Sequence, residues 1–206
     1  STFGSGNNLI CLDKNKMSIR DVNKELERWL KPRILNHTVQ LHYSQKTNKI
    51  LCEKYIESPQ GVAPNDYKFY CFNGEPRVIL AFKERDKGIP IRMFYDLEWS
   101  KLDKYANREF TSGEIEKPLK LNEMIECARK LSEGFPFVRV DLYNVGEQVI
   151  FGELTFTPAA CLSKAHNEEG DKFLGSLLEL PDIGISNSPR RKKMHNAKNT
   201  KVKSFG

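Results

Sequence analysis

Apolar and polar residues alternate along most of this chain at the spacing of β-strands, and a few segments have helix spacing instead. Short apolar or alternating runs indicate strands. They predict strands at 7–12, 50–56, 67–72, 77–82, 91–99 and twice within 138–158. The Asn-Gly-Glu-Pro sequence at 73–76 is a strong turn signal between two of these runs. The pattern therefore predicts hairpins.

Helix-spaced apolar residues predict two helices, and residues 171–180 suggest a third, short one. The first helix begins after Ser18, which can cap it with Asp21 at the third position, and Pro32 limits it. Its apolar stripe comprises Val22, Leu26, Trp29 and Leu30. The second covers 121–131 and ends at a Gly134 cap. Strands dominate, so the predicted fold class is α+β, mainly antiparallel sheets with a few packed helices.

The stretch 138–158, VRVDLYNVGEQVIFGELTFTP, has charged residues inside an apolar hairpin. If its turn centres on Gly146, Arg139 pairs with Glu153. Asp141 and Glu153 are then diagonal neighbours on one face, about 7–8 Å apart. Thr155 shares that face, and the other face is dry: Val138, Val140, Leu142, Ile150, Leu154 and Phe156, with Gly152.

Two interpretations of this polar face stay open at this point. It can be a solvated sheet face with a cross-strand ion pair between Arg139 and Glu153, and such pairs are common and individually weak. It can also be a divalent-metal site. Mg²⁺ prefers oxygen ligands and is usually held by one or two carboxylates together with substrate phosphates. Asp141 and Glu153 supply two carboxylates on a rigid hairpin.

The chain has 206 residues, 39% of them hydrophobic and 29% charged, which is typical of a soluble protein of one domain or two small lobes. No apolar run approaches the roughly 20 residues of a membrane span. The net charge of +6 resides at the C-terminal end, where residues 183–206 contain basic but no acidic side chains. We expect a folded region over 1–182 and a disordered basic tail over 183–206. The tail is either solvated without a specific role or makes weak, charge-driven contact with anionic lipid or nucleic acid.

Five cysteines, at 11, 52, 71, 127 and 161, are widely spaced and form no Cys-x-x-Cys motif. The first residues, which are polar and rich in glycine, lead us to expect no secretory signal sequence. Cys52, Cys71 and Cys127 lie in apolar-patterned segments. We therefore expect reduced, buried thiols of a cytoplasmic protein rather than a zinc site. Among the four histidines, His166 is the one worth testing, because it follows the strand that carries Glu153.

Three further features suit a nucleotide. A glycine-rich segment, Gly4 to Gly6, can close its backbone N–H groups on phosphate oxygens, or it can be a mobile N-terminus. Glu-Lys-Tyr-Ile-Glu at 53–57 ends an apolar run, and backbone at a strand end can bind an adenine edge. Asp66 and Lys68 share one strand face, where an acid suits a ribose hydroxyl and a lysine suits phosphate. The alternative for each is an ordinary surface charge.

The segments that carry a resemblance to a known family are EKYIE, NDYKFYCFNGEPRVI, FYDLEWSKL and FPFVRVDLYNVGEQVIFGELTFTPAA. Over about residues 3–180 the chain resembles the TupA-like ATP-grasp family. The family is associated with teichuronopeptide and capsular polysaccharide biosynthesis. The resemblance implies an ATP-grasp-like fold whose nucleotide-binding region spans 1–182 in two small lobes, with a hinge near 53–57. It also implies nucleotide-binding lysines and an N-terminal substrate lobe before the glycine-rich loop, and this chain begins at that loop.

The resemblance implies ATP and Mg²⁺ as cofactors and assigns roles to individual residues. Metal ligands would be Asp141, Glu153 and Thr155, the last standing where many ATP-grasp enzymes have Asn. Nucleotide-binding residues would be Gly4, Ser5, Gly6, Glu53, Lys54, Tyr55, Ile56 and Asp66. Lys68 takes the basic position that the family has near the nucleotide. The hairpin register adds Arg139 as a contact for phosphate or acyl-phosphate oxygens.

The expected activity is carboxylate–amine ligation through an acyl phosphate, and it needs no protein nucleophile. Glycan-linked carboxylate and amine substrates in cell-surface polysaccharide synthesis are suggested by the resemblance alone. Two other classes of function stay open. The chain can be a truncated, non-catalytic ATP-binding interaction module. It can also bind nucleic acid through its tail, although only Phe205 offers a base-stacking ring there.

Overall fold

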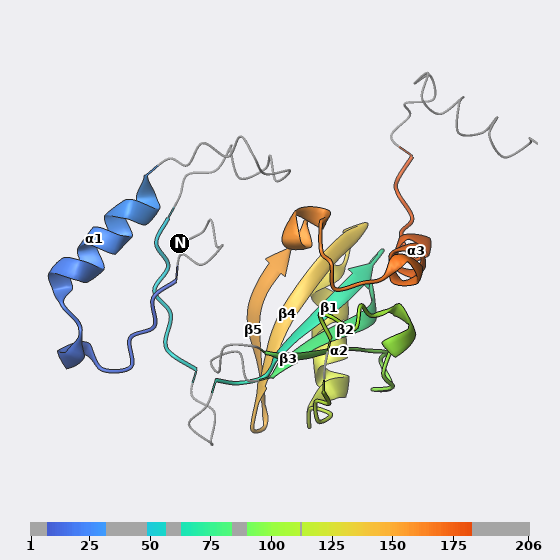
Figure 1. Cartoon of the computed structure of the whole chain (residues 1–206), viewed down its shortest axis with the longest axis horizontal. Helices are drawn as coiled ribbons and strands as arrows, with labels where there is room; N and C mark the ends of the chain where they lie inside the picture. The colour runs from blue at the N-terminus through green and yellow to red at the C-terminus, as the bar shows by residue number, and fades with distance from the viewer. Residues whose placement is uncertain (1–7, 32–48, 57–62, 84–89, 112, 183–206) are drawn as a thin grey trace, which may run out of the picture.

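The computed structural model describes residues 8–31, 49–56, 63–83, 90–111 and 113–182. Its centre is a five-stranded antiparallel sheet in the order β3-β2-β1-β4-β5 (Figure 1). The strands are β1 Asp66–Phe72, β2 Glu75–Lys83, β3 Ile91–Tyr95, β4 Phe137–Val145 and β5 Gln148–Thr155. The predicted α+β class with mainly antiparallel strands is confirmed.

The hairpin predicted around Asn73 is formed by β1 and β2. Asn73 and Gly74 make its turn with positive φ angles of 51° and 84°. Two-residue hairpin turns that match strand twist need such angles, which Asn and Gly adopt most easily. The β1–β2 unit then pairs with β4 through β1, so residues far apart in the chain meet in the middle of the sheet.

Helix α2 (Leu121–Ser132) covers one face of the sheet. Its buried residues recur every three to four positions, as a single apolar stripe requires: Leu121, Met124, Ala128 and Ser132. The stripe belongs to the same core cluster as Tyr67, Phe69 and Cys71, which point to this face from alternate positions of β1. The C-cap is Glu133, and Gly134 follows it at a φ of 81° in a turn that the Phe135 N–H closes on the Ser132 carbonyl, so the predicted glycine lies one position beyond the cap.

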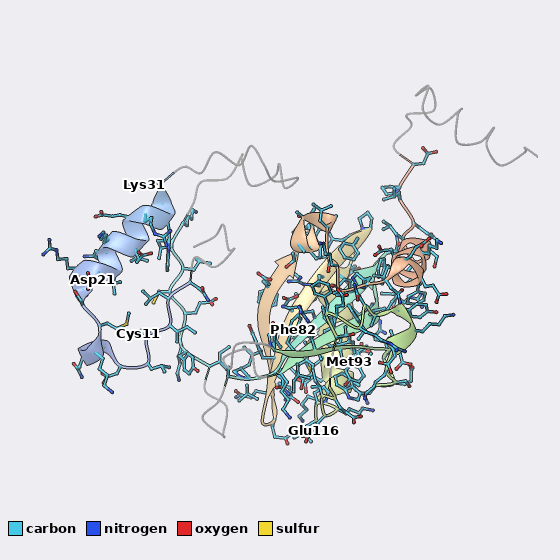
Figure 2. All side chains as sticks on the ribbon, in the orientation of Figure 1. Cys11, Asp21, Lys31, Phe82, Met93 and Glu116 are labelled. Carbon is cyan, nitrogen blue, oxygen red and sulfur yellow. The ribbon has the colours of Figure 1, made fainter. Side chains whose placement is uncertain are left out.

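A second apolar cluster lies on the opposite face. Tyr70 and Phe72 point into it from β1, and Phe173 and Leu174 of α3 (Glu168–Ser176) cover it. The short 3₁₀ turn η4 (Asp103–Tyr105) stacks its Tyr105 ring on Phe173, with 4.3 Å between the centroids. Figure 2 shows the side chains gathered densely around the sheet. The helix predicted over 171–180 therefore exists, but it begins and ends earlier.

The early start of α3 has a local cause. The Asn167 side chain accepts a hydrogen bond of 2.8 Å from the Gly170 backbone N–H, which is an N-cap that the apolar pattern does not reveal. Helix α1 (Ile19–Leu30) has the predicted cap, because Ser18 accepts from the Asp21 N–H at 3.3 Å. Figure 1 shows α1 apart from the sheet. None of the described helices is long and apolar enough to span a membrane.

Three predicted strands are wrong in whole or part. Residues 8–12 and 49–56 form no strand, and their apolar side chains, such as Leu12 and Leu51, are exposed. A strand needs a neighbour to complete its hydrogen bonds, and no described strand pairs with either segment. The strand expected over 91–99 stops at Tyr95, because Asp96 accepts the N–H groups of Glu98 and Ser100 and turns the chain.

The cysteine prediction holds only in part. Cys71 is fully buried on β1 and Cys127 is partly buried on α2, whereas Cys52 is exposed. Cys52 is exposed because the strand predicted to bury it does not form. Residues 4–6 and 183–206, where the glycine-rich loop and the basic tail were predicted, lie outside the described residues. The division into two lobes with a hinge near 53–57 stays a prediction.

The β4–β5 hairpin has a tighter turn and a different register from the predicted one. Its turn is Gly146 and Glu147, so Val145 pairs with Gln148. Past a bulge, Arg139 pairs with Thr155 and not with Glu153. Past the bulge the shift from the predicted partner is two residues, an even number, and so Asp141, Glu153 and Thr155 keep the predicted face. Between the turn and the bulge the shift is one residue, so Ile150 pairs with Tyr143 and leaves the dry face. Phe151 likewise pairs with Leu142 instead of Asp141.

Candidate active site: a buried charge cluster on the sheet

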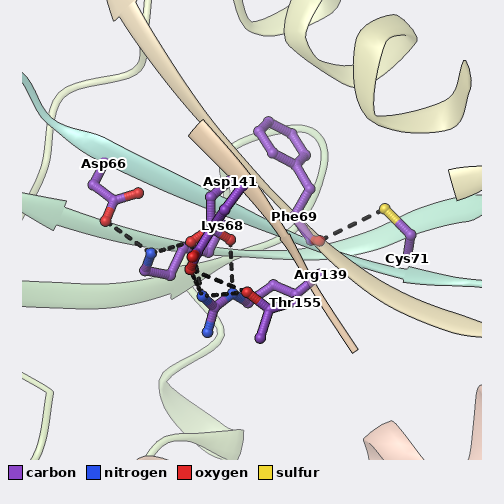
Figure 3. A network of polar contacts seen from close by, with 8 residues as sticks. Asp66, Lys68, Phe69, Cys71, Arg139, Asp141 and Thr155 are labelled. Carbon is purple, nitrogen blue, oxygen red and sulfur yellow. Dashed lines mark hydrogen bonds and ion pairs between the residues drawn. The ribbon is translucent and has the colours of Figure 1, made fainter. Parts of the chain in front are cut away.

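Charged residues of alternating sign cross the seam between β1 and β4, on the face opposite α2. Lys68 pairs with Asp141 across the seam. The Lys68 ammonium lies 2.8 Å from the Asp66 carboxylate and also contacts the Asp141 carboxylate (Figure 3). Asp66, Lys68 and Asp141 are all buried. The interpretation of Asp66 and Lys68 as ordinary surface charges is therefore wrong.

Arg139 extends the cluster toward the sheet edge. Its guanidinium grips both oxygens of Asp141, with Nε donating to Oδ1 at 2.7 Å and Nη2 to Oδ2 at 2.8 Å. Such two-point contacts are among the strongest that arginine makes. The same Nη2 donates to Glu153 Oε1 at 2.9 Å and to Thr155 Oγ1 at 3.0 Å. The Thr155 hydroxyl in turn donates to Glu153 Oε1 at 3.1 Å.

A β-bulge makes this convergence possible. If the pairing seen next to the turn continued along both strands, Gly152 would stand opposite Asp141, and Glu153 would point to the other face of the sheet. The register shifts between Asp141 and Leu142, and beyond the shift Glu153 stands opposite Asp141. A Cβ on Gly152 would lie 3.0 Å from the Asp141 carbonyl oxygen and 3.1 Å from a Tyr143 ring carbon. Glycine at the bulge therefore lets the backbone approach closely.

Burial and charge act against each other in this cluster. Burial raises the pKa of Asp141, and the neighbouring Lys68 and Arg139 offset part of that rise. For Arg139, burial alone would lower the pKa, but hydrogen bonding and charge from Asp141 outweigh it, so the pKa is raised and the guanidinium stays charged. The Asp141 side chain is 3% exposed and that of Glu153 61%. The charge cluster is therefore shielded from solvent on the β1 side and accessible to solvent on the β5 side.

The three residues predicted as metal ligands meet at one point. Oxygens of Asp141, Glu153 and Thr155 all lie within 3.0 Å of Arg139 Nη2. A positively charged nitrogen thus stands among two carboxylates and a hydroxyl, and these hard oxygen donors suit Mg²⁺. Within the described ranges, no three His, Cys, Asp or Glu side chains group to hold a metal. The donor types of the hairpin thus suit Mg²⁺, but the described residues do not by themselves form a complete metal site.

Part of the solvated-face interpretation of the hairpin is confirmed, and the divalent-metal interpretation stays a prediction. The Arg139–Glu153 ion pair exists at 2.9 Å. The face is nevertheless not a solvated one, because Asp141 is buried on it. By contrast, Glu53, Lys54, Tyr55 and Ile56 lie in an exposed or partly exposed segment without strand structure, outside the sheet. The structure does not place them beside the charge cluster, and their predicted hinge role stays a prediction.

Two aromatic neighbours of the cluster escaped the sequence analysis. Tyr70 follows Lys68 on the same face of β1 and pairs with Arg139. Burial raises the pKa of Tyr70 to about 12, with Arg139 lowering it and Asp141 raising it further. The Phe82 ring lies under Lys68, with its centroid 5.6 Å from Nζ. The two-residue period of β1 was the signal that could have placed Tyr70 beside Lys68.

His166 lies in the apolar cluster next to this face. Its ring centroid is 4.6 Å from that of Phe94 and 6.0 Å from that of Tyr70. Burial lowers the pKa of His166, and Asp171 offsets part of that effect. The neutral ring is therefore packed as an aromatic side chain among others, and its contacts are structural.

Comparisons with known proteins identify the family of the chain. A protein-family profile described as TupA-like ATPgrasp matches residues 1–179. The comparison with curated proteins gave no match. One similar solved structure is described as the ATP-grasp ligase PsnB complexed with a phosphomimetic variant of its minimal precursor, Mg and ADP. It is 14% identical, with a TM-score of 0.29, and the alignment covers 56% of this chain and 33% of that ligase. That score is too low to establish a shared fold.

Proposed function

The chain belongs to the TupA-like ATP-grasp family, and from that premise we propose that it acts in ATP- and Mg²⁺-dependent carboxylate–amine ligation through an acyl phosphate. The observation that carries the proposal is the convergence of Asp141, Glu153 and Thr155 on one cationic atom. The family hairpin thus has an oxygen-lined site for a cation at the open end of the cluster.

Asp141, Glu153 and Thr155 would hold the magnesium ion. When bound, the ion offsets negative charge on the phosphates of ATP. Asp141 needs to be ionised and fixed for this role. In the protein without nucleotide, Lys68 contacts Asp141 Oδ2 and Arg139 contacts both of its oxygens. Thr155 is the weakest of the three donors, since its oxygen carries no charge.

Lys68 and Arg139 have different parts in the proposal. Lys68 is held between two buried carboxylates, so we assign it the positioning of Asp141 rather than direct contact with phosphate. Arg139 stands at the open end of the cluster beside the exposed Glu153. Its planar fork matches the geometry of phosphate and acyl-phosphate oxygens. Arg139 is therefore the cation that would face the transferring group.

The proposed reaction has two steps. The γ-phosphoryl group of ATP passes to a substrate carboxylate oxygen and ADP leaves. An amine then attacks the carbonyl carbon and phosphate leaves, and the amine loses its proton as the amide forms. Positioning and charge stabilisation account for the catalysis, and no side chain of the protein forms a covalent intermediate. Arg139 would stabilise charge in both steps.

The finer assignments belong to the same proposal and are supported by the family alone. Gly4, Ser5 and Gly6 would cover the phosphates, and Glu53 to Ile56 would contact adenine. Asp66, predicted to contact the nucleotide, is 1% exposed and pairs with Lys68, so we assign it to the positioning of Lys68. The carboxylate and amine would be glycan-linked compounds of teichuronopeptide or capsule synthesis, handled in the cytoplasm. A substrate screen should therefore contain glycan-linked carboxylates and amines of this kind.

Calorimetric titration of ATP, with and without Mg²⁺, tests the proposal on the native protein and on Glu153→Gln. Glu153 is exposed, so the variant should fold. Glu147→Gln is the matched control, because Glu147 lies in the turn of the same hairpin and pairs there with Lys120 at 2.6 Å. We expect metal-dependent binding that Glu153→Gln weakens and Glu147→Gln leaves intact. Absence of binding by the native protein, or equal binding by all three proteins, would contradict the proposal.

A further inference from the structure

The cation at the centre of the oxygen set is part of the protein itself. Arg139 Nη2 lies 2.8 Å from Asp141 Oδ2, 2.9 Å from Glu153 Oε1 and 3.0 Å from Thr155 Oγ1. Three residues from two strands thus satisfy one atom of one side chain. In Figure 3 the Arg139 side chain lies between Asp141 and Thr155, with dashed contacts running to both.

A guanidinium and a metal ion compete for these oxygens. Magnesium binds oxygen at about 2.0–2.1 Å. Because Nη2 lies 2.8 and 2.9 Å from the Asp141 and Glu153 oxygens, an ion bound to both would lie within about 5 Å of Nη2, where the two positive charges repel each other. Metal binding is therefore opposed while Arg139 stays on these oxygens and is favoured when its side chain withdraws.

The charges of the cluster favour withdrawal only when another anion arrives. Asp66, Asp141 and Glu153 supply three negative charges, and Lys68 and Arg139 supply two positive ones. In the protein alone, the tethered Arg139 is always available to the oxygens, so a metal ion has to compete with it. A triphosphate changes this balance because it offers the guanidinium new oxygens in the bidentate geometry that arginine prefers.

We propose that Arg139 is an internal counter-cation that occupies the metal position in the nucleotide-free protein and moves to the phosphates when metal and nucleotide bind together. The inference rests on the proposed function. It makes metal binding depend on the nucleotide, since a metal ion alone offers the Arg139 guanidinium no new anionic oxygens to bind. It also delivers a positive charge to the phosphates at the moment when the metal arrives.

The test is a titration of the nucleotide-free protein with Mn²⁺, with free Mn²⁺ followed by electron paramagnetic resonance. We expect Arg139→Gln to bind Mn²⁺ at least about tenfold more tightly than the native protein, because a unit charge in contact with the ligands is removed. Arg129→Gln is the matched control. Arg129 also contacts two carboxylates, Glu75 at 3.0 Å and Glu126, but it does so on α2 away from the hairpin. This control should leave Mn²⁺ affinity unchanged.

Two further variants complete the test. In Arg139→Gln/Glu153→Gln the gain should disappear, which places the ion on the hairpin. Arg139→Lys guards against a folding failure, since it keeps the buried charge. Its ammonium lacks the fork that spans Asp141 and Glu153, so Mn²⁺ should bind severalfold more tightly than to the native protein. Circular dichroism verifies that each variant is folded.

The proposal is overturned if folded Arg139 variants bind Mn²⁺ no more tightly than the native protein, or if Arg129→Gln gains as much. This outcome differs from failure of the proposed function, which is measured by ATP binding to the native protein and to Glu153→Gln. A native protein that binds Mg²⁺ and ATP on the hairpin, while Arg139→Gln shows no gain for Mn²⁺ alone, would refute only the counter-cation role.

Discussion

Replacing Lys68 with Met removes the one ammonium that stands between two buried carboxylates. The Lys68 Nζ lies 2.8 Å from Asp66 and also contacts Asp141, and those two side chains are 1% and 3% exposed. Methionine matches the length of the lysine stem and removes the ammonium, which also lies 5.6 Å from the Phe82 ring centroid, so the change is mainly electrostatic. It leaves Asp66 and Asp141 close to each other without the cation between them.

The expected loss follows from that burial. Removing one partner of a buried ion pair costs about 3–5 kcal/mol, because the charge left behind is neither solvated nor compensated. Asp141 keeps its two hydrogen bonds from Arg139, which limits the loss on that side. We therefore expect Lys68→Met to lower the free energy of unfolding by about 3 kcal/mol at pH 7. That is a large share of the roughly 5–15 kcal/mol that stabilises a typical domain.

The loss should shrink at low pH. Burial already raises the pKa of Asp141, and losing Lys68 raises it further. In the variant, the folded protein then takes up a proton at a pH where the unfolded chain does not. Stability therefore falls as pH rises through that folded pKa, and it is regained as pH is lowered. We expect the difference between variant and native protein to narrow steadily from pH 7 toward pH 4.

Urea denaturation followed by far-ultraviolet circular dichroism measures these differences. Lys172→Met is the matched control. Its ammonium lies 2.6 Å from Glu168, but the two side chains are 74% and 84% exposed. Exposed pairs of this kind contribute about 0–1 kcal/mol. Equal losses in the two variants would show that burial does not strengthen the Lys68 contacts, and the account of the cluster would be wrong.

Three further predictions concern the rest of the fold. Gly170→Ala should destabilise the protein by about 1–3 kcal/mol, since its Cβ would lie 2.2 Å from a backbone carbonyl oxygen. Gly175→Ala in the same helix meets nothing within 4 Å and should stabilise by about 0.4–1 kcal/mol in the same urea assay. His166, whose pKa burial lowers, should make stability fall below about pH 6.5 by up to about 1.4 kcal/mol per pH unit, until the folded protein also takes up the proton. His166→Phe should flatten that part of the curve of unfolding free energy against pH. Burial raises the pKa of the Cys71 thiol to about 12. Mass spectrometry after alkylation at pH 8 should therefore find Cys71 unmodified and the exposed Cys161 labelled. Rapid labelling of both cysteines would argue against the burial of Cys71.

Local signals predicted the elements whose partners lie next to them in the chain. The Asn-Gly turn was enough to define β1 and β2, and one apolar stripe was enough to define α2. The polar face of the β4–β5 hairpin was also predicted, although the register was wrong by one residue near the turn and by two past the bulge. The even error past the bulge preserves the faces of the strand, so Asp141, Glu153 and Thr155 were grouped correctly.

Long-range features were beyond a reading of the pattern. The apolar run at 50–56 resembled a strand, but the sequence does not say whether a neighbouring strand is available. The burial of Asp66 and Lys68 depends on the pairing of β1 with β4, whose contact residues Lys68 and Asp141 are 73 positions apart. The bulge at Gly152 left no mark in the alternation of polar and apolar residues. These features result from tertiary pairing, which local propensity does not encode.

The order β3-β2-β1-β4-β5 also has a consequence for how the chain folds. Each hairpin closes locally, and isolated hairpins form in about 1–10 μs. The pairing of β1 with β4 joins the hairpins across a long stretch of chain that contains β2, β3 and α2. Bringing these distant strands together is entropically costly and should limit the folding rate. Lys68 and Asp141 face each other across that seam. The contact between Lys68 and Asp141 is therefore expected to form in the slowest step, and both side chains stay hydrated until the two hairpins dock.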